Sequence, residues 1–376
     1  MFKIFIPADA LAETYLREFR RNGSNQSKWY KILLKQSNIC TIGYDESDVD
    51  PMSDSNIINI LAKSYSTINI EPKDKYISLI NDNPEIVMEN PNSLFYLDIP
   101  SKLAKSIQNH YGVMCQSAKK KIDTKPLTTI PGLIDFNKFR EVQITDCWKE
   151  VFKVPSLTPS NGLCIIDRNL FSNDWYWKNL SDKKYMDGVR NVFCILENAL
   201  PNNFDKDYHV TIICEQPSGS NSDISQNNQI ENLNPLDTLS ELLFSAIELL
   251  KRNYNIVMEI IAFKKGSRYY NELTHNRQII SNYYRIDAPN GLGLSTIRYK
   301  EGQETAQYGQ NVMSFLLYST GLNSCGSDCP IRSNERVVND YNKFINYWRK
   351  NCETDEYWYA CNTNKTFLDH KNRLFY

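Results

Sequence analysis

Glycine and histidine are scarce in this chain of 376 residues, which contains 14 glycines and four histidines. So few glycines, without any internal repeat, argue against a solenoid or a fibrous protein. No apolar run approaches the length of about 18 residues that a transmembrane helix requires, so none is expected. The first residues lack a long apolar run and carry acids early, so no signal peptide is expected either.

An excess of one charge is also missing, because 43 Lys and Arg are balanced by 44 Asp and Glu, for a formal net charge of −1. This balance argues against a uniformly basic nucleic-acid-binding chain, although it permits a local basic patch. Hydrophobic residues make up 41% and charged residues 23%, which is ordinary for a soluble globular protein. The length predicts about two domains.

Ten cysteines without a secretory signal predict reduced thiols in a cytoplasmic protein. Most lie in apolar or mixed sequence, and we expect them to be buried as small hydrophobic side chains. These are Cys40, Cys115, Cys147, Cys164, Cys194 and Cys214. The others have spacings of C-x3-C and C-x8-C, which are loose for a zinc site, so both zinc binding and unlinked thiols stay open. They are Cys325, Cys329, Cys352 and Cys361.

Alternating strand and helix patterns predict an α/β domain over residues 1–122, followed by a linker over 123–138 that contains Pro126 and Pro131. A helix is expected to end at Gly112, the residue type that most easily adopts a left-handed conformation. The expected strands are 2–7, 39–44, 93–99 and 112–117, and the expected helices are 9–21, 27–36, 56–65 and 101–112.

A second α/β domain, with a mixed sheet covered by helices, is predicted over residues 139–376. A Ser- and Asn-rich insertion at 217–235 is expected to be a loop or disordered. Thr238 and Glu241 form a capping-box pattern that predicts the start of a helix. The expected strands are 140–148, 161–171, 208–215, 255–265, 277–287 and 291–299, and the expected helices are 186–200, 238–253 and 335–350.

The segment around His275 and Arg277 carries the most informative chemistry. Two residues two positions apart on a strand point to the same face. The loop that precedes this segment carries further cations. Several fixed cations around one imidazole are a suitable binding site for a phosphate group. These loop cations are Lys264, Lys265 and Arg268.

The spacing resembles the phospholipase D superfamily, whose motif is His-x-Lys-x4-Asp followed by a Gly-Ser element. His275 matches the His, Arg277 stands where the Lys belongs, and Asn282 stands where the Asp belongs. Gly291, Gly293 and Ser295 stand where the Gly-Ser element would follow. Over about 160–300 the chain most resembles the single, degenerate phospholipase-D-like domain at the C-terminus of MIT-domain proteins and related bacterial defence-associated proteins.

This resemblance implies that His275 attacks phosphorus and that Arg277 and Ser295 help to hold the phosphate. Asn282 cannot supply the negative charge of the motif's carboxylate, and Glu215, which ends a neighbouring strand, is a substitute acid. An active site of this family needs two motifs, so catalysis here implies a homodimer. The resemblance thus implies recognition of a phosphodiester or nucleic acid, with cleavage only in a dimer, and no cofactor.

Three other interpretations stay open. His275 and Arg277 can be an ordinary hydrogen-bonded His beside a surface Arg, in a chain that only docks a protein partner in a larger antiviral assembly. The N-terminal acids Asp9, Glu13 and Asp98 can gather a divalent metal, as in a PIN-like nuclease, although helix capping also explains Asp98. Finally, the Tyr-Tyr pairs beside arginines can stack on bases, although rings in strands are more often buried in the core. No membrane partner is expected.

Overall fold

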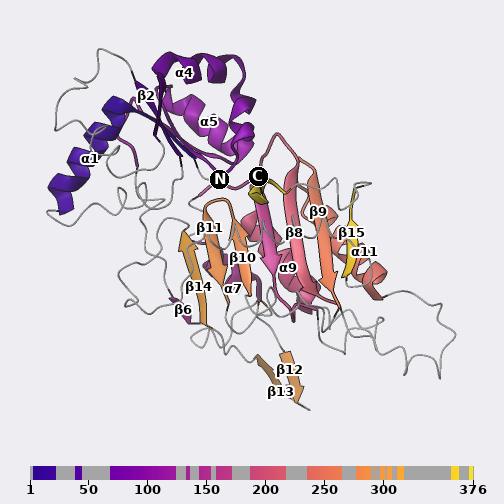
Figure 1. Ribbon diagram of the computed structural model, residues 1–376. Coiled ribbons are helices and arrows are strands. Elements are labelled where there is room, and N and C mark those ends of the chain that lie inside the picture. Colours follow the sequence, from indigo (N-terminus) through magenta and orange to yellow (C-terminus); the bar gives the residue numbers. More distant parts are fainter. Residues whose placement is uncertain are drawn as a thin grey trace.

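The chain folds into two α/β units, which Figure 1 shows side by side. The computed structural model describes residues 3–22, 39–44, 68–123, 133–135, 144–153, 158–171, 187–216, 235–264, 277–288, 292, 297–300, 303–306, 311–316, 357–363 and 372–375. The α/β class predicted from the alternating patterns is confirmed. In the described parts of the chain, no helix combines the length and the apolar character that crossing a lipid bilayer requires.

The first unit, within the described residues, is a five-stranded sheet in the order β3-β2-β1-β4-β5, and every neighbouring pair is parallel. Its strands are β1 (Lys3–Pro7), β2 (Ile39–Tyr44), β3 (Ile68–Pro72), β4 (Leu94–Leu97) and β5 (Met114–Ser117). Its helices are α1 (Ala8–Asn22), α4 (Lys73–Asp82), the 3-10 helix η1 (Pro84–Glu89) and α5 (Ser101–Tyr111). The strand order reverses between β1 and β4, which lie side by side.

Apolar strands hold this unit together. Phe5 of β1 and Phe95 of β4 stack with their ring centroids 4.8 Å apart. Ala104 and Ile107, three positions apart on α5, turn one helix face into the same core. Every residue of β4 is buried, as expected for a parallel strand covered on both faces.

The second unit contains an eight-stranded mixed sheet, within the described residues, in the order β15-β9-β8-β7-β10-β11-β14-β6. The strands β7 (Gly162–Ile166), β8 (Tyr208–Glu215) and β9 (Ile256–Phe263) are parallel, and the remaining pairs are antiparallel. The other strands are β6 (Leu133–Asp135), β10 (Gln278–Ser281), β11 (Tyr284–Asp287), β14 (Asn311–Leu316) and β15 (Tyr357–Cys361). The strands β12 (Ile297–Lys300) and β13 (Gln303–Ala306) pair separately.

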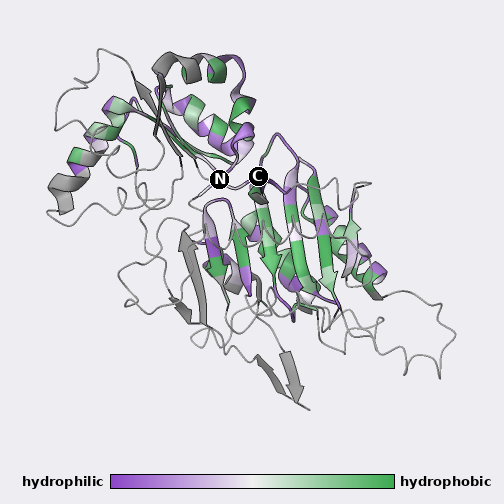
Figure 2. Ribbon diagram, viewed as in Figure 1, coloured by the Kyte–Doolittle hydropathy of each residue, from purple (hydrophilic) through white to green (hydrophobic). Residues whose placement is uncertain are grey.

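One face of the larger sheet packs against α7 (Ile144–Phe152), α9 (Asp187–Ala199) and α11 (Pro235–Leu249). Alternate residues of β7, β8 and β9 face these helices and build the main core. In β9 the residues between them are also buried, so this strand is buried along its whole length. Figure 2 shows these central strands as mainly hydrophobic.

Several predicted elements differ from the structure. The strand expected over 161–171 ends earlier, because β7 covers only Gly162–Ile166 and a turn follows Asp167. Residues 140–148 were expected to form a strand, but Ile144–Phe152 is helix α7. Trp148, Val151 and Phe152 repeat at three and four positions, and this helical spacing becomes complete only beyond the segment used for the strand prediction. The single strand expected over 277–287 is a hairpin of β10 and β11. The linker expected over 123–138 contains β6, which pairs with β14 in the second sheet.

The helix start predicted at Thr238 also differs, because α11 begins at Pro235. Proline favours the first helical position, and the capping-box residues Thr238 and Glu241 therefore lie inside the helix. Helices predicted over 27–36, 56–65 and 335–350, and the insertion over 217–235 apart from its last residue, lie outside the described residues.

The two units are joined by buried carboxamides. The Nδ2 of Asn161 donates to the carbonyl oxygens of Tyr111 (3.3 Å) and Gly112 (3.2 Å) in the first unit. Its Oδ1 accepts a 2.9 Å hydrogen bond from Nδ2 of Asn282, which also donates to Asn92 Oδ1 at 2.6 Å. The Asn282 Oδ1 accepts from the backbone N–H of Asn161. We call Asn92, Asn161 and Asn282 the carboxamide cluster.

Further contacts reinforce this junction. The Tyr283 hydroxyl donates to Ser93 O at 2.6 Å and accepts from the Met114 N–H at 2.9 Å. On the surface, Lys206 Nζ lies 2.7 Å from Glu85 Oε1. The last described segment, η5 (Arg373–Phe375), also contributes, because Arg373 O accepts from Asn92 Nδ2 at 3.0 Å.

Gly112 ends α5 with a left-handed φ of 61°, as predicted, and packs closely against the second unit. A Cβ at this position would lie 2.1 Å from the backbone oxygen of Ser160. We therefore expect Gly112→Ala to lower the free energy of unfolding by at least about 2 kcal/mol, through left-handed strain and the clash. Urea unfolding measures the effect.

The matched control is Ser106→Ala, on an exposed position of the same helix, which should leave the unfolding midpoint unchanged. An unfolding midpoint of Gly112→Ala equal to that of the control would contradict the close approach of the two units.

Candidate functional site

The candidate site lies at the carboxyl end of β7, where the order of the second sheet reverses. β8 and β9 follow β7 on one side, whereas β10 flanks it on the other. Ligands of α/β sheets bind at such switch points, outside the carboxyl ends of the strands. Asp167 directly follows β7. Gln278 pairs with Ile166, so the next position of the antiparallel register places Arg277 opposite Asp167.

Asp167 is almost completely buried, with 1% of its surface exposed. Its Oδ1 accepts a 2.9 Å hydrogen bond from the Asn169 N–H, and its Oδ2 accepts a 2.6 Å bond from the Leu292 N–H. Burial raises the pKa of this carboxyl group above its usual value, against the opposing effects of these two N–H groups and of Arg277 and Arg168. The site therefore holds a desolvated carboxyl group whose charge is stabilised mainly by backbone donors.

Arg277 is the cation of this arrangement. Its Nε lies 3.7 Å from Asp167 Oδ1, and 21% of its side chain is exposed. Its backbone is fixed, because its carbonyl oxygen accepts a 2.9 Å hydrogen bond from the Ala288 N–H. Arg277 is thus a partly exposed guanidinium beside a buried acid, and a guanidinium matches the geometry of phosphate oxygens.

Other predicted residues lie along the same sheet edge. Glu215 ends β8, is buried at 8% exposure, and donates its backbone N–H to Arg168 O at 3.2 Å. The alternation of β8 directs Glu215 to the face opposite that of Cys214, whereas Cys214 shares the face of Asp167. Lys264 follows β9 and is exposed. Arg168, Lys264 and Arg277 thus lie along the same edge as two buried acids, which face opposite sides of the sheet.

Several predicted site residues cannot be placed. His275, Lys265, Arg268 and Ser295 lie outside the described residues, and so do Gly291 and Gly293.

Asn282 does not lie with Arg277. Arg277 precedes β10 and Asn282 follows it, so the two residues are at opposite ends of the strand. Asn282 is buried at 3% exposure, and its carboxamide belongs to the carboxamide cluster at the junction. An interaction of its side chain with a phosphate held by Arg277 is therefore not supported by this geometry.

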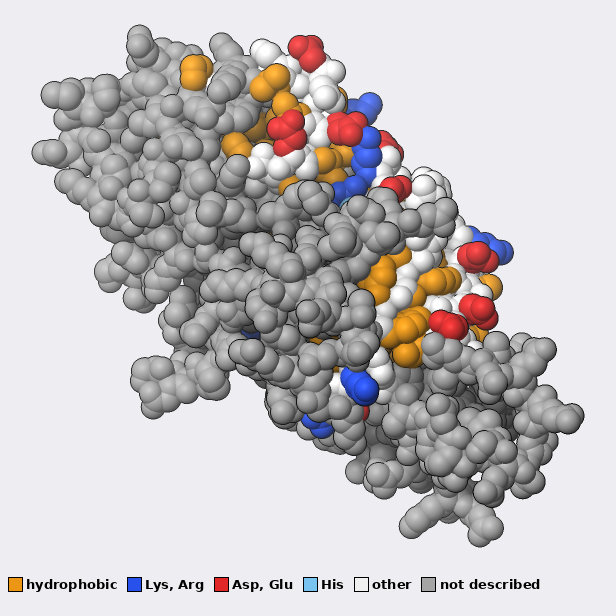
Figure 3. All heavy atoms as spheres, turned by 45° about the vertical axis from the view of Figure 1, so that its right-hand side comes forward, with side chains coloured by type: hydrophobic (Ala, Val, Ile, Leu, Met, Phe, Trp, Pro, Cys, Tyr) orange, Lys and Arg blue, Asp and Glu red, His pale blue; other side chains and the backbone are white. Residues whose placement is uncertain are grey.

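The proposed stacking of bases on Tyr283 and Tyr284 is also not supported. Both rings are buried, at 0% and 2% exposure. Tyr283 donates to Ser93 O at the junction, and Tyr284 packs edge-on against Phe152 with ring centroids 6.0 Å apart. On the face shown in Figure 3, basic side chains of the described surface are interspersed with acidic ones rather than gathered into one patch.

The N-terminal acids lie at the switch point of the first sheet. Asp9 lies in the first turn of α1, directly after β1, and Asp98 directly follows β4, the neighbouring strand. Asp98 Oδ1 is 3.9 Å from Lys119 Nζ, and Asp9 and Glu13 are exposed. Within the described residues, no three His, Cys, Asp or Glu side chains gather closely enough to hold a metal ion by themselves.

The sequence interpretation did not assign Asp167 to the site and placed it within the strand expected over 161–171, whereas β7 ends at Ile166. A carboxylate at the end of a buried strand is the available signal, but Asp167 becomes informative only through its contact with Arg277, which lies far away in the sequence.

The chain was compared with protein-family models and with curated protein sequences, and it matches none of them. The resemblance to phospholipase-D-like domains therefore rests on the residues of its motif alone.

Four thiols that the structure describes as buried belong to Cys115, Cys164, Cys194 and Cys214, as the sequence predicted. Burial raises the pKa of Cys115 to about 12 and that of Cys194 to about 11. Because the thiolate is the reactive form, we expect iodoacetamide at pH 8 to modify these four residues about 100-fold or more slowly in the folded protein than in urea. Peptide mass spectrometry measures each site, and equal rates in the two states would contradict the burial.

Cys361 differs from these four, because it is half-buried and its Sγ lies 3.2 Å from Thr363 Oγ1. Its proposed zinc partners Cys325, Cys329 and Cys352 lie outside the described residues.

Proposed function

We propose that the chain recognises a phosphodiester, as found in a nucleic acid, at the carboxyl edge of the second sheet. The supporting observation is the contact of Arg277 with the buried carboxyl group of Asp167 at the switch point of the sheet. Arg277 is the anchoring cation in this proposal, and Asp167 is a positioning residue that acts through it. Arg168 and the exposed Lys264 add charge along the same edge.

The charges at this edge support binding of a phosphate group better than they support a complete catalytic motif. A guanidinium matches the geometry of two phosphate oxygens, and it stays charged at every physiological pH. Asn282 is held in the junction, so the residue at the carboxylate position of the phospholipase D motif does not lie beside Arg277. Cleavage through His275 would then require two copies of the chain to pair at this edge.

Binding of 5′-labelled single-stranded DNA and RNA by fluorescence anisotropy tests the proposal. We expect Arg277→Ala to weaken binding about 10-fold. The slope of log K against log salt concentration should become shallower by the amount that corresponds to about one lost phosphate contact. Arg277→Lys should recover part of the affinity, because it restores the charge without the planar fork.

Arg190→Ala, which removes an exposed arginine from α9, is the matched control and should bind like the wild type. If Arg277→Ala folds normally and binds as tightly as Arg190→Ala, the site is wrong. Absence of binding by the wild type would instead favour a non-enzymatic subunit that docks a protein partner.

A second candidate function, a metal-dependent nuclease, is favoured by the strand order of the first sheet. We propose that Asp9 and Asp98, at the ends of the adjacent strands β1 and β4, hold a divalent ion such as Mg2+ together with water and substrate phosphates. Two carboxylates fit Mg2+, which usually keeps several waters, and the ion would stabilise charge on a phosphoryl group. Lys119, 3.9 Å from Asp98, would help to orient that carboxylate.

Cleavage of labelled single-stranded RNA and DNA with Mg2+ tests this candidate. We expect Asp9→Asn and Asp98→Asn each to slow cleavage about 100-fold or more, because each removes a negative ligand without changing its shape. Asp82→Asn, at an exposed acid in the last turn of α4, is the control. Cleavage that persists with a chelator, or in both variants, would exclude this function and leave the Arg277 site untouched.

A further inference from the structure

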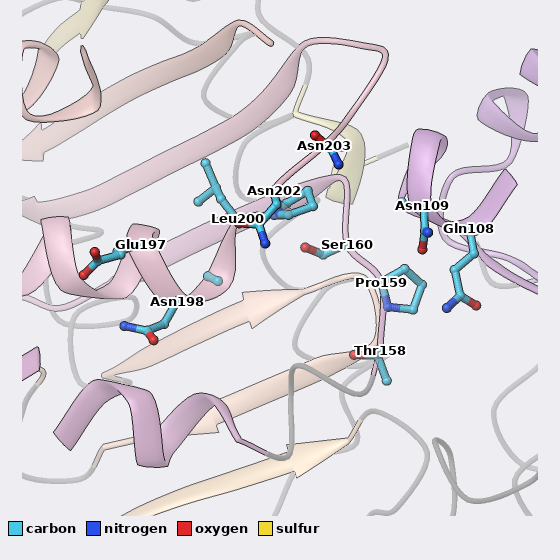
Figure 4. Close-up of a pocket in the computed structure, with 13 residues that line it drawn as sticks. Gln108, Asn109, Thr158, Pro159, Ser160, Glu197, Asn198, Leu200, Asn202 and Asn203 are labelled. Atoms are coloured by element: carbon cyan, nitrogen blue, oxygen red, sulfur yellow. The ribbon is translucent and has the colours of Figure 1, made fainter. Parts of the chain in front are cut away.

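A polar pocket lies where the two units meet, apart from both candidate sites. It has a cavity volume of about 560 Å3, within the usual size range of small-molecule sites. The last turn of α5 forms one wall, the last turn of α9 and the loop after it form another, and residues 158–160 lie between them. Figure 4 shows Gln108 and Asn109 on the α5 side, Glu197 and Asn198 on the α9 side, and Pro159 and Ser160 between them.

Carboxamides dominate this lining. They are Gln108, Asn109, Asn198, Asn202 and Asn203. Each carboxamide can both donate and accept hydrogen bonds. Among the described residues, the side chains of Gln108, Asn109 and Asn203 have no hydrogen-bond partner. They are therefore available to a ligand.

Neighbouring contacts fix which groups two other carboxamides present. Asn202 Oδ1 accepts a 3.1 Å hydrogen bond from Arg252 Nη1, which leaves its Nδ2 to donate into the pocket. Asn198 Nδ2 donates to Cys194 O at 2.8 Å, which leaves its Oδ1 to accept. The hydroxyl of Ser160 is held 2.6 Å from the Tyr208 hydroxyl. The pocket thus offers hydrogen-bond donors and acceptors whose orientation is fixed by neighbouring contacts.

The electrostatics of the pocket disfavour an anion. No Lys, Arg or His is among the described residues that line it, and Glu197 contributes a carboxylate. The last turns of both α5 and α9 line it, and helix C-termini carry partial negative charge. Arg252 offsets part of this charge at the end of α9, because its Nη2 donates to Glu197 O at 3.0 Å.

We infer that this pocket binds a neutral saccharide, whose neighbouring hydroxyls each donate and accept as the carboxamides do. Among the described residues, the lining contains no aromatic ring on which a nucleobase could stack, whereas Pro159, Pro201 and Leu200 provide small apolar surfaces for the C–H faces of a sugar. Because both units contribute, the bound sugar bridges α5 and α9.

Saturation-transfer NMR on the full chain tests the inference with a panel of glucose, galactose, mannose, N-acetylglucosamine and their common disaccharides. At least one neutral sugar should bind, and glucose 6-phosphate should bind at least 10-fold more weakly than glucose. The double variant Asn109→Ala and Asn203→Ala removes one unpaired carboxamide from each wall and should weaken binding of the sugar at least 10-fold.

The control is the double variant Asn81→Ala and Asn253→Ala, at two exposed asparagines outside the pocket, which should bind like the wild type. Failure of the whole panel to bind would overturn the inference. So would equal binding by the two double variants, and so would binding of adenosine or uridine without binding of any sugar. Because none of these variants touches Arg277, Asp9 or Asp98, these outcomes are independent of the proposed functions.

Discussion

The hydrogen-bonded pair of Asn161 and Asn282 is the contact on which the arrangement of this molecule depends. Both side chains are buried, at 0% and 3% exposure, and both carboxamides are engaged on their oxygen and nitrogen atoms. A buried polar group left without a partner costs about 1–3 kcal/mol, so such a cluster is stable only when every member is in place. It therefore ties three separate backbone segments, before β4, before β7 and after β10, to one geometry.

Because of this contact, one edge of the second sheet forms the junction with the first unit, and the opposite edge carries the candidate site. At the amino end of β7, Asn161 and Gly162 are joined to the first unit and to the turn after β10. At the carboxyl end of the same strand, Asp167 and Arg277 remain beside the strand ends where α/β proteins bind ligands. Fixing β10 at its Asn282 end also fixes the register that places Arg277 opposite Asp167.

A buried carboxylate also ties the C-terminal segment to the second sheet. Glu259 on β9, at 2% exposure, accepts a 2.5 Å hydrogen bond from the Thr211 hydroxyl. That hydroxyl accepts in turn from Asn372 Nδ2 at 2.8 Å. The chain end thus returns to the central strands, and Arg373 then reaches the first unit through Asn92. Polar groups inside the larger sheet therefore position its surroundings, while its apolar face provides the core.

Elements with a strong local pattern could be predicted from the sequence. The strands over 39–44 and 208–215 have the predicted bounds, and Gly112 ends its helix as expected, because these features depend on neighbouring residues. Helix α7 could not be distinguished from a strand by its sequence, since short apolar segments fit both the helical and the strand period. The site was predicted less well: Arg277 directly precedes β10 instead of lying within a strand, Asn282 is a junction residue, and Asp167 was not assigned.

The sequence by itself determined the α/β class, part of the described strands and helices, and the burial of Cys115, Cys164, Cys194 and Cys214. Hydrophobic periodicity carries that information, because burial is repeated along each element. Only the tertiary structure decided that Asn161 meets Asn282, that Arg277 meets Asp167, and that α5 and α9 end at one pocket. The physical reason is that each of these contacts joins residues far apart in the chain, whose approach is set by strand register and by the satisfaction of buried polar groups.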